Sequence, residues 1–316
     1  MRILLVSSHG FKVVKEKGRI VVKYNNDDKK EPVSVPLKDL DLLVISARGS
    51  ITTTALKALS LNGIPVVFVV GEKPVAIYSP LFAHGTVIVR REQMLAYKDG
   101  RGLDLAKKFS YATTMNKYYV LKYYAKSRKM PFLREYADDI KVLAEEILQV
   151  DGDLDRVRNK ILGYEGRAAK IYFEALTYLF PSSFGFSGRN KRKPKDPVNA
   201  FLSYGYVVLN SIVTYAISIV GLEPFAGYLH ADRSGKPSLI LDLAEEFRQP
   251  IVDTLALNLF SKRILKHDDF DYIDNEVKLN KKGKEKFFTY FNRKLESLVY
   301  FEGNHITFKA AILRQA

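Results

Sequence analysis

The sequence of 316 residues lacks cysteine altogether, which excludes disulfide bonds and zinc sites built from thiolates. This absence fits a reducing cytoplasm, where we expect the protein to be located. The apolar opening Met1–Val6 is too short and too soon interrupted for a signal peptide. Negative charge is scarce, because 35 Asp and Glu stand against 50 Lys and Arg, a formal charge of +15. The excess predicts an anionic partner, with nucleic acid first and an acidic membrane surface second.

Charge is also missing from one long stretch. No charged residue occurs from Phe201 to Leu222, which is long enough to span a bilayer. Small polar side chains form a stripe on one face of this stretch if it is helical: Ser203, Asn210, Ser211, Thr214 and Ser218. We therefore interpret it as a buried helix that faces other helices or a polar cleft, and a membrane span is the alternative. We expect no membrane association.

The chain is expected to be an α+β protein. Short β-rich runs and turns fill residues 1–86, and helical periodicity dominates 87–316, so we predict a small β-rich domain followed by a larger all-α domain. His9-Gly10 between Ile3–Ser7 and Phe11–Val14 predicts a hairpin. The other expected strands are Arg19–Tyr24, Val33–Pro36, Asp41–Ile45, Pro65–Val70 and Val75–Tyr78. The main expected helices are Thr52–Asn62, Leu103–Lys126, Tyr136–Val150, Leu154–Phe180, Leu239–Phe247, Ile251–Leu265 and Lys281–Tyr300.

Carboxylates and one histidine gather in Tyr228–Phe247. Asp242, Glu245 and Glu246 are spaced so that they share a helical face, where they repel one another unless a cation or water screens them. His230 lies shortly upstream. One imidazole with clustered carboxylates suits Mn²⁺ or Mg²⁺ better than structural zinc. Spacing alone, however, favours a surface helix with solvated acids.

A further carboxylate, Glu165, lies beside small residues. Gly166, Ala169 and Lys170 fall near one side of a helix, and we expect a neighbouring helix to approach closely there. An unpaired acid at such a place is costly. The alternative is a glutamate favoured by the dipole of a helix N-terminus.

A basic loop precedes the charge-free stretch. Gly188–Lys195 carries Arg189, Lys191, Arg192 and Lys193, and Asp196 after it can cap the next helix. With the net charge in mind, we interpret the loop as a phosphate-contacting segment. A solvated flexible loop is the alternative.

Three motifs occur in order along the chain: Gly163–Ala169, Pro194–Tyr206 and Gly227–Arg248. With the β-rich front and helical body, they make the chain similar to the CRISPR-associated integrase-endonuclease family, the universal CRISPR adaptation protein. The likeness covers essentially the whole chain, although the helical domain carries the motifs.

The resemblance implies a metal-dependent DNA endonuclease and integrase, which inserts short DNA fragments (spacers) into a CRISPR array by phosphodiester transesterification. It implies that Glu165, His230 and Glu245 are catalytic and bind one Mn²⁺ or Mg²⁺. The last position is often aspartate in the family. Asp242 is therefore expected either to contact these ligands without binding the metal itself or to be an alternate metal ligand. The DNA contacts that we expect are Arg189, Lys191, Arg192, Lys193 and Lys236.

The resemblance also implies partners. These are double-stranded DNA fragments and the CRISPR repeat, a second copy of the chain bound through the β-rich domain, and the small second CRISPR adaptation protein. Two other functions stay open on the residues alone. One is a non-catalytic nucleic-acid-binding scaffold, and the other is a metallohydrolase of small phosphoesters that would not need the basic loop.

Overall fold

The computed structural model describes residues 3–24, 31–70, 73–79, 87–190, 192–231 and 233–316. They form two compact units, one of Met1–Val87 with Thr214–Leu222 and one of Ile88–Val213 with Glu223–Ala316. From the sequence a single boundary after residue 86 is expected. The structure assigns Thr214–Leu222, the last turns of the charge-free helix, to the first unit.

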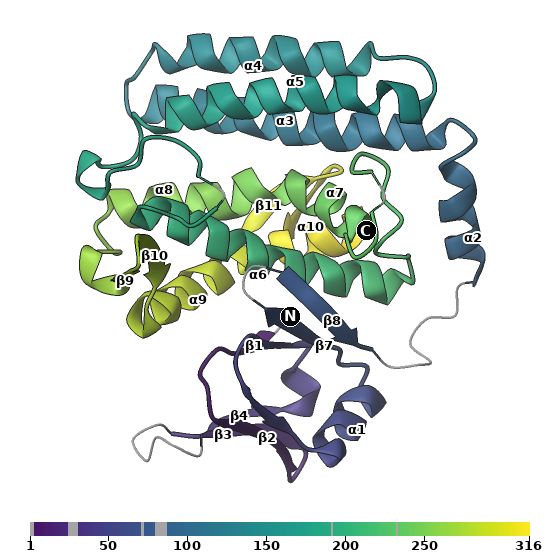
Figure 1. The fold of residues 1–316 in the computed structure, drawn as a ribbon, viewed down its shortest axis with the longest axis vertical. Helices are drawn as coiled ribbons and strands as arrows, with labels where there is room; N and C mark the ends of the chain where they lie inside the picture. Colours follow the sequence, from purple (N-terminus) through teal and green to yellow (C-terminus); the bar gives the residue numbers. More distant parts are fainter. Residues whose placement is uncertain (1–2, 25–30, 71–72, 80–86, 191, 232) are drawn as a thin grey trace. The chain divides into compact units, whose positions relative to one another are not determined.

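The first unit contains two four-stranded sheets, in the strand orders β1-β5-β7-β8 and β4-β3-β2-β6. In the first sheet, β1, β5 and β7 are parallel and β8 is antiparallel to β7 (Figure 1). Buried Val, Leu and Ile side chains of both sheets and of helix α1 form one core. The bounds are β1 Ile3–Val6, β2 Phe11–Glu16, β3 Arg19–Tyr24, β4 Val33–Pro36, β5 Leu42–Ile45, β6 Gly49–Ile51, α1 Thr53–Leu61, β7 Val66–Val70 and β8 Lys73–Tyr78.

The predicted hairpin at His9-Gly10 is wrong. Strand β1 pairs with β5, whereas β2 pairs with β3 and β6, so the chain changes sheets between β1 and β2. The hairpin turn lies instead at Lys17-Gly18, where both residues have positive φ angles of 42° and 76° as a tight β-turn requires. His9 anchors the crossover, because its Nδ1 accepts a hydrogen bond from the Arg48 amide at 3.0 Å.

The second unit is mainly helical. Helices α3, α4 and α5 run side by side (Figure 1), and α3 also packs against α7. Pro250 cannot donate a backbone hydrogen bond, and the helix widens around it into the π-helical segment Arg248–Asp253 between α7 and α8. The helix bounds are α2 Val87–Ala96, α3 Arg101–Ser127, α4 Leu133–Leu148, α5 Leu154–Leu176, α6 Pro197–Val220, α7 Ser238–Phe247, α8 Thr254–Ser261, α9 Lys281–Glu296 and α10 Phe308–Gln315.

The prediction of a strand-rich first part and a mostly helical second part is confirmed. The expectation of a purely α-helical second domain is wrong, because two antiparallel hairpins interrupt it: β9 Phe270–Ile273 with β10 Glu276–Leu279, and β11 Leu298–Phe301 with β12 Asn304–Thr307. The predicted helix Lys281–Tyr300 therefore ends at Glu296. A turn at Glu302-Gly303, with φ angles of 46° and 82°, closes the second hairpin.

Helix α6 is a core helix. Among the described residues, it is long and apolar enough to cross a membrane, but 94% of its most apolar 18-residue window is buried inside the protein. Its polar stripe is buried as well, since Ser203 and Ser211 are almost inaccessible to solvent. Asp196 begins the helix as expected, because its carboxylate accepts a hydrogen bond from the Asn199 amide at 2.8 Å.

The close packing against a neighbouring segment occurs at Gly205 on α6 and not at Gly166. A Cβ atom added to Gly205 would lie 2.4 Å from the Val252 side chain in the π-helical segment, whereas one added to Gly166 would meet nothing within 4 Å. The expectation for Gly166 is therefore wrong. Gly166 is exposed, and the buried small residue on that part of α5 is Ala168.

We predict opposite effects for two Gly→Ala substitutions. Gly205→Ala should lower the free energy of unfolding by about 1–3 kcal/mol, because the methyl group overlaps Val252. Gly163→Ala, at an open helical position on α5, should raise it by about 0.5–1 kcal/mol through helix propensity. Urea denaturation of both variants measures the difference. Equal stability of the two variants would contradict the packing described for Gly205.

Candidate active site

The three motifs come together in the second unit. Helix α5 supplies Glu165, the segment before α7 supplies His230, and α7 supplies Asp242 and Glu245. Helix α3 packs against both α5 and α7 and closes the group from another side. The charges of Glu245 and His230 both act on the Glu165 carboxyl, so the structure brings the three predicted ligands into one neighbourhood.

Asp242 holds the histidine in place. Its Oδ1 accepts hydrogen bonds from the His230 amide at 2.9 Å and faces His230 Nδ1 at 2.7 Å. Its Oδ2 accepts bonds from the amides of Tyr228 at 2.8 Å and Leu229 at 3.0 Å. The carboxylate is fully buried and engaged at both oxygens. With Nδ1 donating to Asp242, the lone pair of His230 is on Nε2, the arrangement that metal-binding histidines use.

Glu165 is the unsatisfied member of the group. Its Oε2 is buried and has no hydrogen-bond partner among the described residues. Burial raises the pKa of this carboxyl, and the negative charge of Glu245 raises it further, while Lys117, His230 and a contact with the Ser110 hydroxyl act in the opposite direction. A buried carboxylate oxygen without a partner, next to a second carboxylate, is an unfavourable arrangement that a cation would relieve.

Glu245 is held by an arginine one turn away. Arg248 donates a hydrogen bond to Glu245 Oε1, and its guanidinium lies over the Tyr206 ring, 4.8 Å from the ring centre. Arg248 Nε is buried without a partner among the described residues. The side chain of Glu245 is only 15% exposed, so water screens the two charges of this ion pair only partly.

Asp253 lies deeper in the protein. Tyr206 donates a hydrogen bond to its Oδ1 at 2.7 Å and Tyr172 donates one to its Oδ2 at 3.0 Å. Burial raises the pKa of Asp253 to about 6, although these two hydrogen bonds act to lower it. Asp253 therefore links α5, α6 and the π-helical segment beneath the site.

These residues fit a divalent cation, although they are not closed around one. No group of three or more His, Asp and Glu side chains within the described ranges is already arranged to hold a metal ion. The donor set is nevertheless one imidazole with a free Nε2 and two carboxylates, one of them with an unpartnered oxygen. Oxygen ligands with a single imidazole suit Mn²⁺ or Mg²⁺.

The basic loop is tied to the start of α6. Arg189 donates hydrogen bonds to the Asn199 side chain at 2.9 Å and to the Ser203 hydroxyl at 3.0 Å, and its guanidinium lies 5.4 Å from the Tyr206 ring centre. Arg189 thus anchors the loop from inside. Arg192 and Lys193 are exposed and are available to a phosphate backbone. Lys191 lies outside the described residues.

Lys236 lies between His230 and helix α7 in the chain and is half-buried. Burial lowers the pKa of its ammonium, the nearby Arg233 lowers it further, and Asp242 raises it. The charge of Lys236 therefore interacts with that of Asp242, the residue that orients His230.

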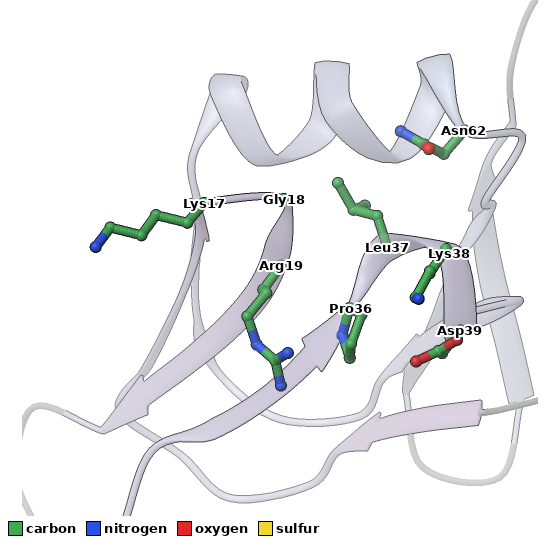
Figure 2. A pocket seen from close by; sticks show the side chains of 8 residues that line it. All are labelled: Lys17, Gly18, Arg19, Pro36, Leu37, Lys38, Asp39 and Asn62. Atoms are coloured by element: carbon green, nitrogen blue, oxygen red, sulfur yellow. The ribbon is translucent and has the colours of Figure 1, made fainter.

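A pocket of about 620 Å³ lies elsewhere, on the first unit, and it is not the candidate site. Its lining includes Lys17, Arg19, Lys38 and Asp39, and the side chains of Lys17 and Arg19 point in different directions (Figure 2). Arg19 already bonds Ser34 through its Nε at 2.6 Å. The pocket therefore lacks converging functional groups.

Comparisons with known proteins agree with the motifs. Residues 4–293 match the family model described as CRISPR associated protein Cas1. A CRISPR-associated endonuclease Cas1 from Archaeoglobus fulgidus is 34% identical over 98% of this chain and 90% of its own length. The chain belongs to the Cas1 family.

Solved structures share the fold of this Cas1-family chain. A casposase bound to integration product is 25% identical and superposes with a TM-score of 0.86, covering all of this chain and 88% of the other. A chain of a Cas6-RT-Cas1–Cas2 complex is 18% identical, with a TM-score of 0.77 over 99% of this chain and 34% of the other.

Three residues of this Cas1-family chain were missed by sequence reasoning. Lys117, Arg248 and Asp253 all act on the site, but no pattern in the sequence marks Lys117 or Asp253. Lys117 stands among tyrosines and lysines on a helix, where a lysine is normally a surface residue. Arg248 alone carried a signal, since it stands one turn after Glu245 and can pair with it.

Its spacing in the sequence places Glu246 on the same helical face as Asp242 and Glu245, but its environment is different. It is buried, and its pKa is raised to about 8 by burial, while a hydrogen bond with Gln315 lowers it. The folded state therefore keeps a proton on Glu246 that the unfolded state releases near its ordinary pKa. Between these two values the folded state binds more protons, so this residue makes stability fall as the pH rises.

We predict that Glu246→Gln removes this loss of stability. The variant should exceed the wild type in free energy of unfolding by on the order of 2–4 kcal/mol at about pH 9, with little difference at about pH 5. Urea denaturation at both pH values tests this, with the exposed Glu285→Gln as a control that should show no such trend. A difference independent of pH would refute the buried neutral acid.

Proposed function

We propose that Glu165, His230 and Glu245 hold one Mn²⁺ or Mg²⁺ ion at which DNA phosphodiester bonds are cut and transferred. The observation that carries the proposal is the unpartnered, buried Oε2 of Glu165 beside Glu245, with His230 held so that Nε2 is free. Family membership and the endonuclease relatives support an endonuclease and integrase of CRISPR adaptation. The fold shared with a casposase in an integration complex supports the same function.

The ion would supply charge neutralisation at the scissile phosphate and polarise the attacking or leaving oxygen. Other residues of the chain position the proposed ligands. Asp242 fixes the ring of His230, and the α5 backbone carries Glu165 toward Glu245. Arg248 donates a hydrogen bond to Glu245 and so fixes its position.

The reaction itself is a phosphodiester exchange. In integration, the 3′-hydroxyl of a short DNA fragment attacks a phosphate at the edge of a CRISPR repeat, a new phosphodiester bond forms, and the old 3′-oxygen leaves with a proton. In cleavage, water replaces the attacking hydroxyl. The exposed Arg192 and Lys193 would hold the DNA backbone near the site, and Lys236 would contact a phosphate close to His230.

The proposed assembly has three further members. We propose that the chain binds DNA, forms a homodimer through its strand-rich unit, and assembles with Cas2, the small second adaptation protein. Val33, Leu61 and Val70 on that unit are exposed apolar side chains that a partner chain could cover. The related chain in a Cas6-RT-Cas1–Cas2 complex supports the Cas2 partnership.

We predict that Glu165→Ala and His230→Ala abolish strand transfer of a short duplex into a plasmid that carries a CRISPR repeat. Each change removes a metal ligand, and losses of about 100-fold or more are expected with Mn²⁺ present. Asp242→Asn should retain some activity but weaken Mn²⁺ affinity by about 10–100-fold, because His230 loses its orienting partner.

Chelation of the metal and DNA binding are the controls for that experiment. Chelator should stop cleavage of labelled DNA by the wild type while leaving binding measurable. If all three variants bind DNA and keep wild-type strand transfer, the residues do not form the active site. A protein that binds DNA but shows no metal-dependent cleavage would instead be a non-catalytic scaffold.

We predict that the basic loop sets the salt dependence of DNA binding. Arg192→Gln with Lys193→Gln should weaken binding and reduce the slope of log K against log salt concentration by about 0.9 for each lost phosphate contact. The matched control is Lys12→Gln with Lys15→Gln, which removes the same charge from exposed positions on β2. An enzyme for small phosphoesters would show no effect of the loop variant on turnover.

A further inference from the structure

His230 lies in a part of the chain without regular secondary structure. Between the end of α6 at Val220 and the start of α7 at Ser238, the described residues form turns, bends and irregular chain. The backbone that carries the ring is therefore fixed by individual hydrogen bonds to neighbouring elements. The bonds to Asp242 on α7 are one group of these.

Gln93 on α2 supplies a second group. Its side chain is buried and bonds the Glu223–Ala226 turn, in which the Ala226 amide donates to the Glu223 oxygen at 3.3 Å. Gln93 Nε2 donates to the backbone oxygens of Glu223 and Ala226, both at 2.9 Å, and Oε1 accepts a bond from the Glu223 amide at 2.7 Å. A carboxylate there would only accept and an ammonium would only donate, so the turn matches an amide.

The bonds continue from Gln93 to Tyr228, shortly before His230. The Tyr228 hydroxyl donates to the backbone oxygen of Gln93 at 3.1 Å. The Tyr228 backbone oxygen accepts a bond from Arg158 Nε on α5 at 3.1 Å, and its amide donates to Asp242 at 2.8 Å. Every polar group of this buried tyrosine is thus bonded, to α2, α5 and α7 respectively.

Gly227 shows how closely the same segment lies against α7. A Cβ atom added to Gly227 would lie 2.6 Å from Ser238 Cβ and 2.8 Å from Asp242 Oδ2. The Leu239 amide, in the first turn of α7, donates to the Pro224 oxygen at 3.1 Å. The segment before His230 is therefore bonded to α7 as well as to α2, and it has no room to shift toward α7.

We propose that Gln93 is a positioning residue for His230, because its side chain fixes to α2 the turn from which the His230 segment continues. The hydrogen bonds that carry this inference do not involve a metal, but its effect on catalysis rests on the proposed metal centre. Loss of the Gln93 amide would leave one backbone amide and two backbone oxygens of a buried turn without that partner, which is unfavourable. The turn would then move, and Tyr228 would pass the movement on to His230.

The first test is a Mn²⁺ titration of the full chain, followed by the electron paramagnetic resonance signal of free Mn²⁺. Gln93→Met keeps an unbranched side chain of similar length and removes the amide. It should bind Mn²⁺ about threefold to tenfold more weakly, a smaller loss than the roughly 10–100-fold expected when a direct partner of a metal ligand is removed. The affinity for a short DNA duplex should stay at the wild-type value, because Gln93 is buried and uncharged.

A double-mutant cycle separates positioning from general destabilisation. In the His230→Ala background, Gln93→Met should have no further effect on Mn²⁺ affinity, since the ring that it positions is gone. A residue that only stabilises the fold would weaken Mn²⁺ binding by the same factor in both backgrounds. Either that result or an unchanged affinity of Gln93→Met would overturn the proposal.

The histidine ring gives a second readout that needs no metal. In NMR spectra of nitrogen-labelled histidine, the ring shifts report which nitrogen carries the proton, and the His230 signals are identified by their absence in His230→Ala. The wild type should show the proton on Nδ1, bonded to Asp242. Gln93→Met should move these shifts toward a mixture of the two tautomers. The ring of His267, held by Tyr272 and Ser183, is an internal reference that should not change.

Two further variants control for damage to the fold. Ile140→Val removes a buried methyl group from α4 and should lower the melting temperature without changing either readout. Tyr228→Phe removes only the hydroxyl that bonds the Gln93 backbone, so it should move the His230 shifts in the same direction as Gln93→Met but by less. If Gln93→Met does not fold, wild-type ring shifts in Tyr228→Phe would overturn the link between α2 and His230.

Failure of the metal centre gives a different result. A wild type that binds no Mn²⁺, or a His230→Ala variant that binds it as well as the wild type, would remove the proposed centre. The ring shifts would then decide the role of Gln93 alone. A wild-type Mn²⁺ site, with unchanged affinity and unchanged ring shifts in Gln93→Met, removes only the role of Gln93.

Discussion

The site depends on one buried carboxylate, that of Asp242. Four groups of the Tyr228–His230 segment approach its two oxygens: three backbone amides and the imidazole of His230. A carboxylate with no solvent exposure is stable only when it is fully hydrogen-bonded, and this one is. The same bonds fasten an irregular segment to helix α7. The position of His230 is thus a consequence of how a buried charge is satisfied.

The neighbouring acids are satisfied less completely. Asp253 receives two tyrosine hydroxyls and Glu245 receives Arg248, but Glu165 keeps an oxygen without a partner. Such a gradient from complete to incomplete satisfaction distinguishes supporting residues from residues that await a ligand. The groups that sequence reasoning missed belong to the supporting set. Asp253 is buried and bonds tyrosines far away in the sequence, whereas Arg248 is half-buried and pairs with Glu245 three residues earlier.

The sequence predicted what local patterns determine. Hydrophobic periodicity located most helices and strands, and the cap at Asp196 was visible in the residue order. It failed where distant segments decide the outcome. Gly166 and Gly205 both lie within helices, yet only Gly205 packs tightly, against the Val252 side chain. Strand β1 avoids the hairpin because β5 pairs with it. Lys117 could not be recognised, since nothing local shows that the acids of α5 and α7 surround it.

The charge distribution also suggests an order of events. The chain carries +15 overall, so DNA is attracted to its surface, for which Arg192 and Lys193 are exposed. More carboxylates than cations nevertheless gather at the candidate site, so a phosphate would be repelled there. A divalent ion at the proposed site would reverse that sign. Long-range attraction and local repulsion would then allow DNA to bind the protein without metal but admit a scissile phosphate only after the ion is in place.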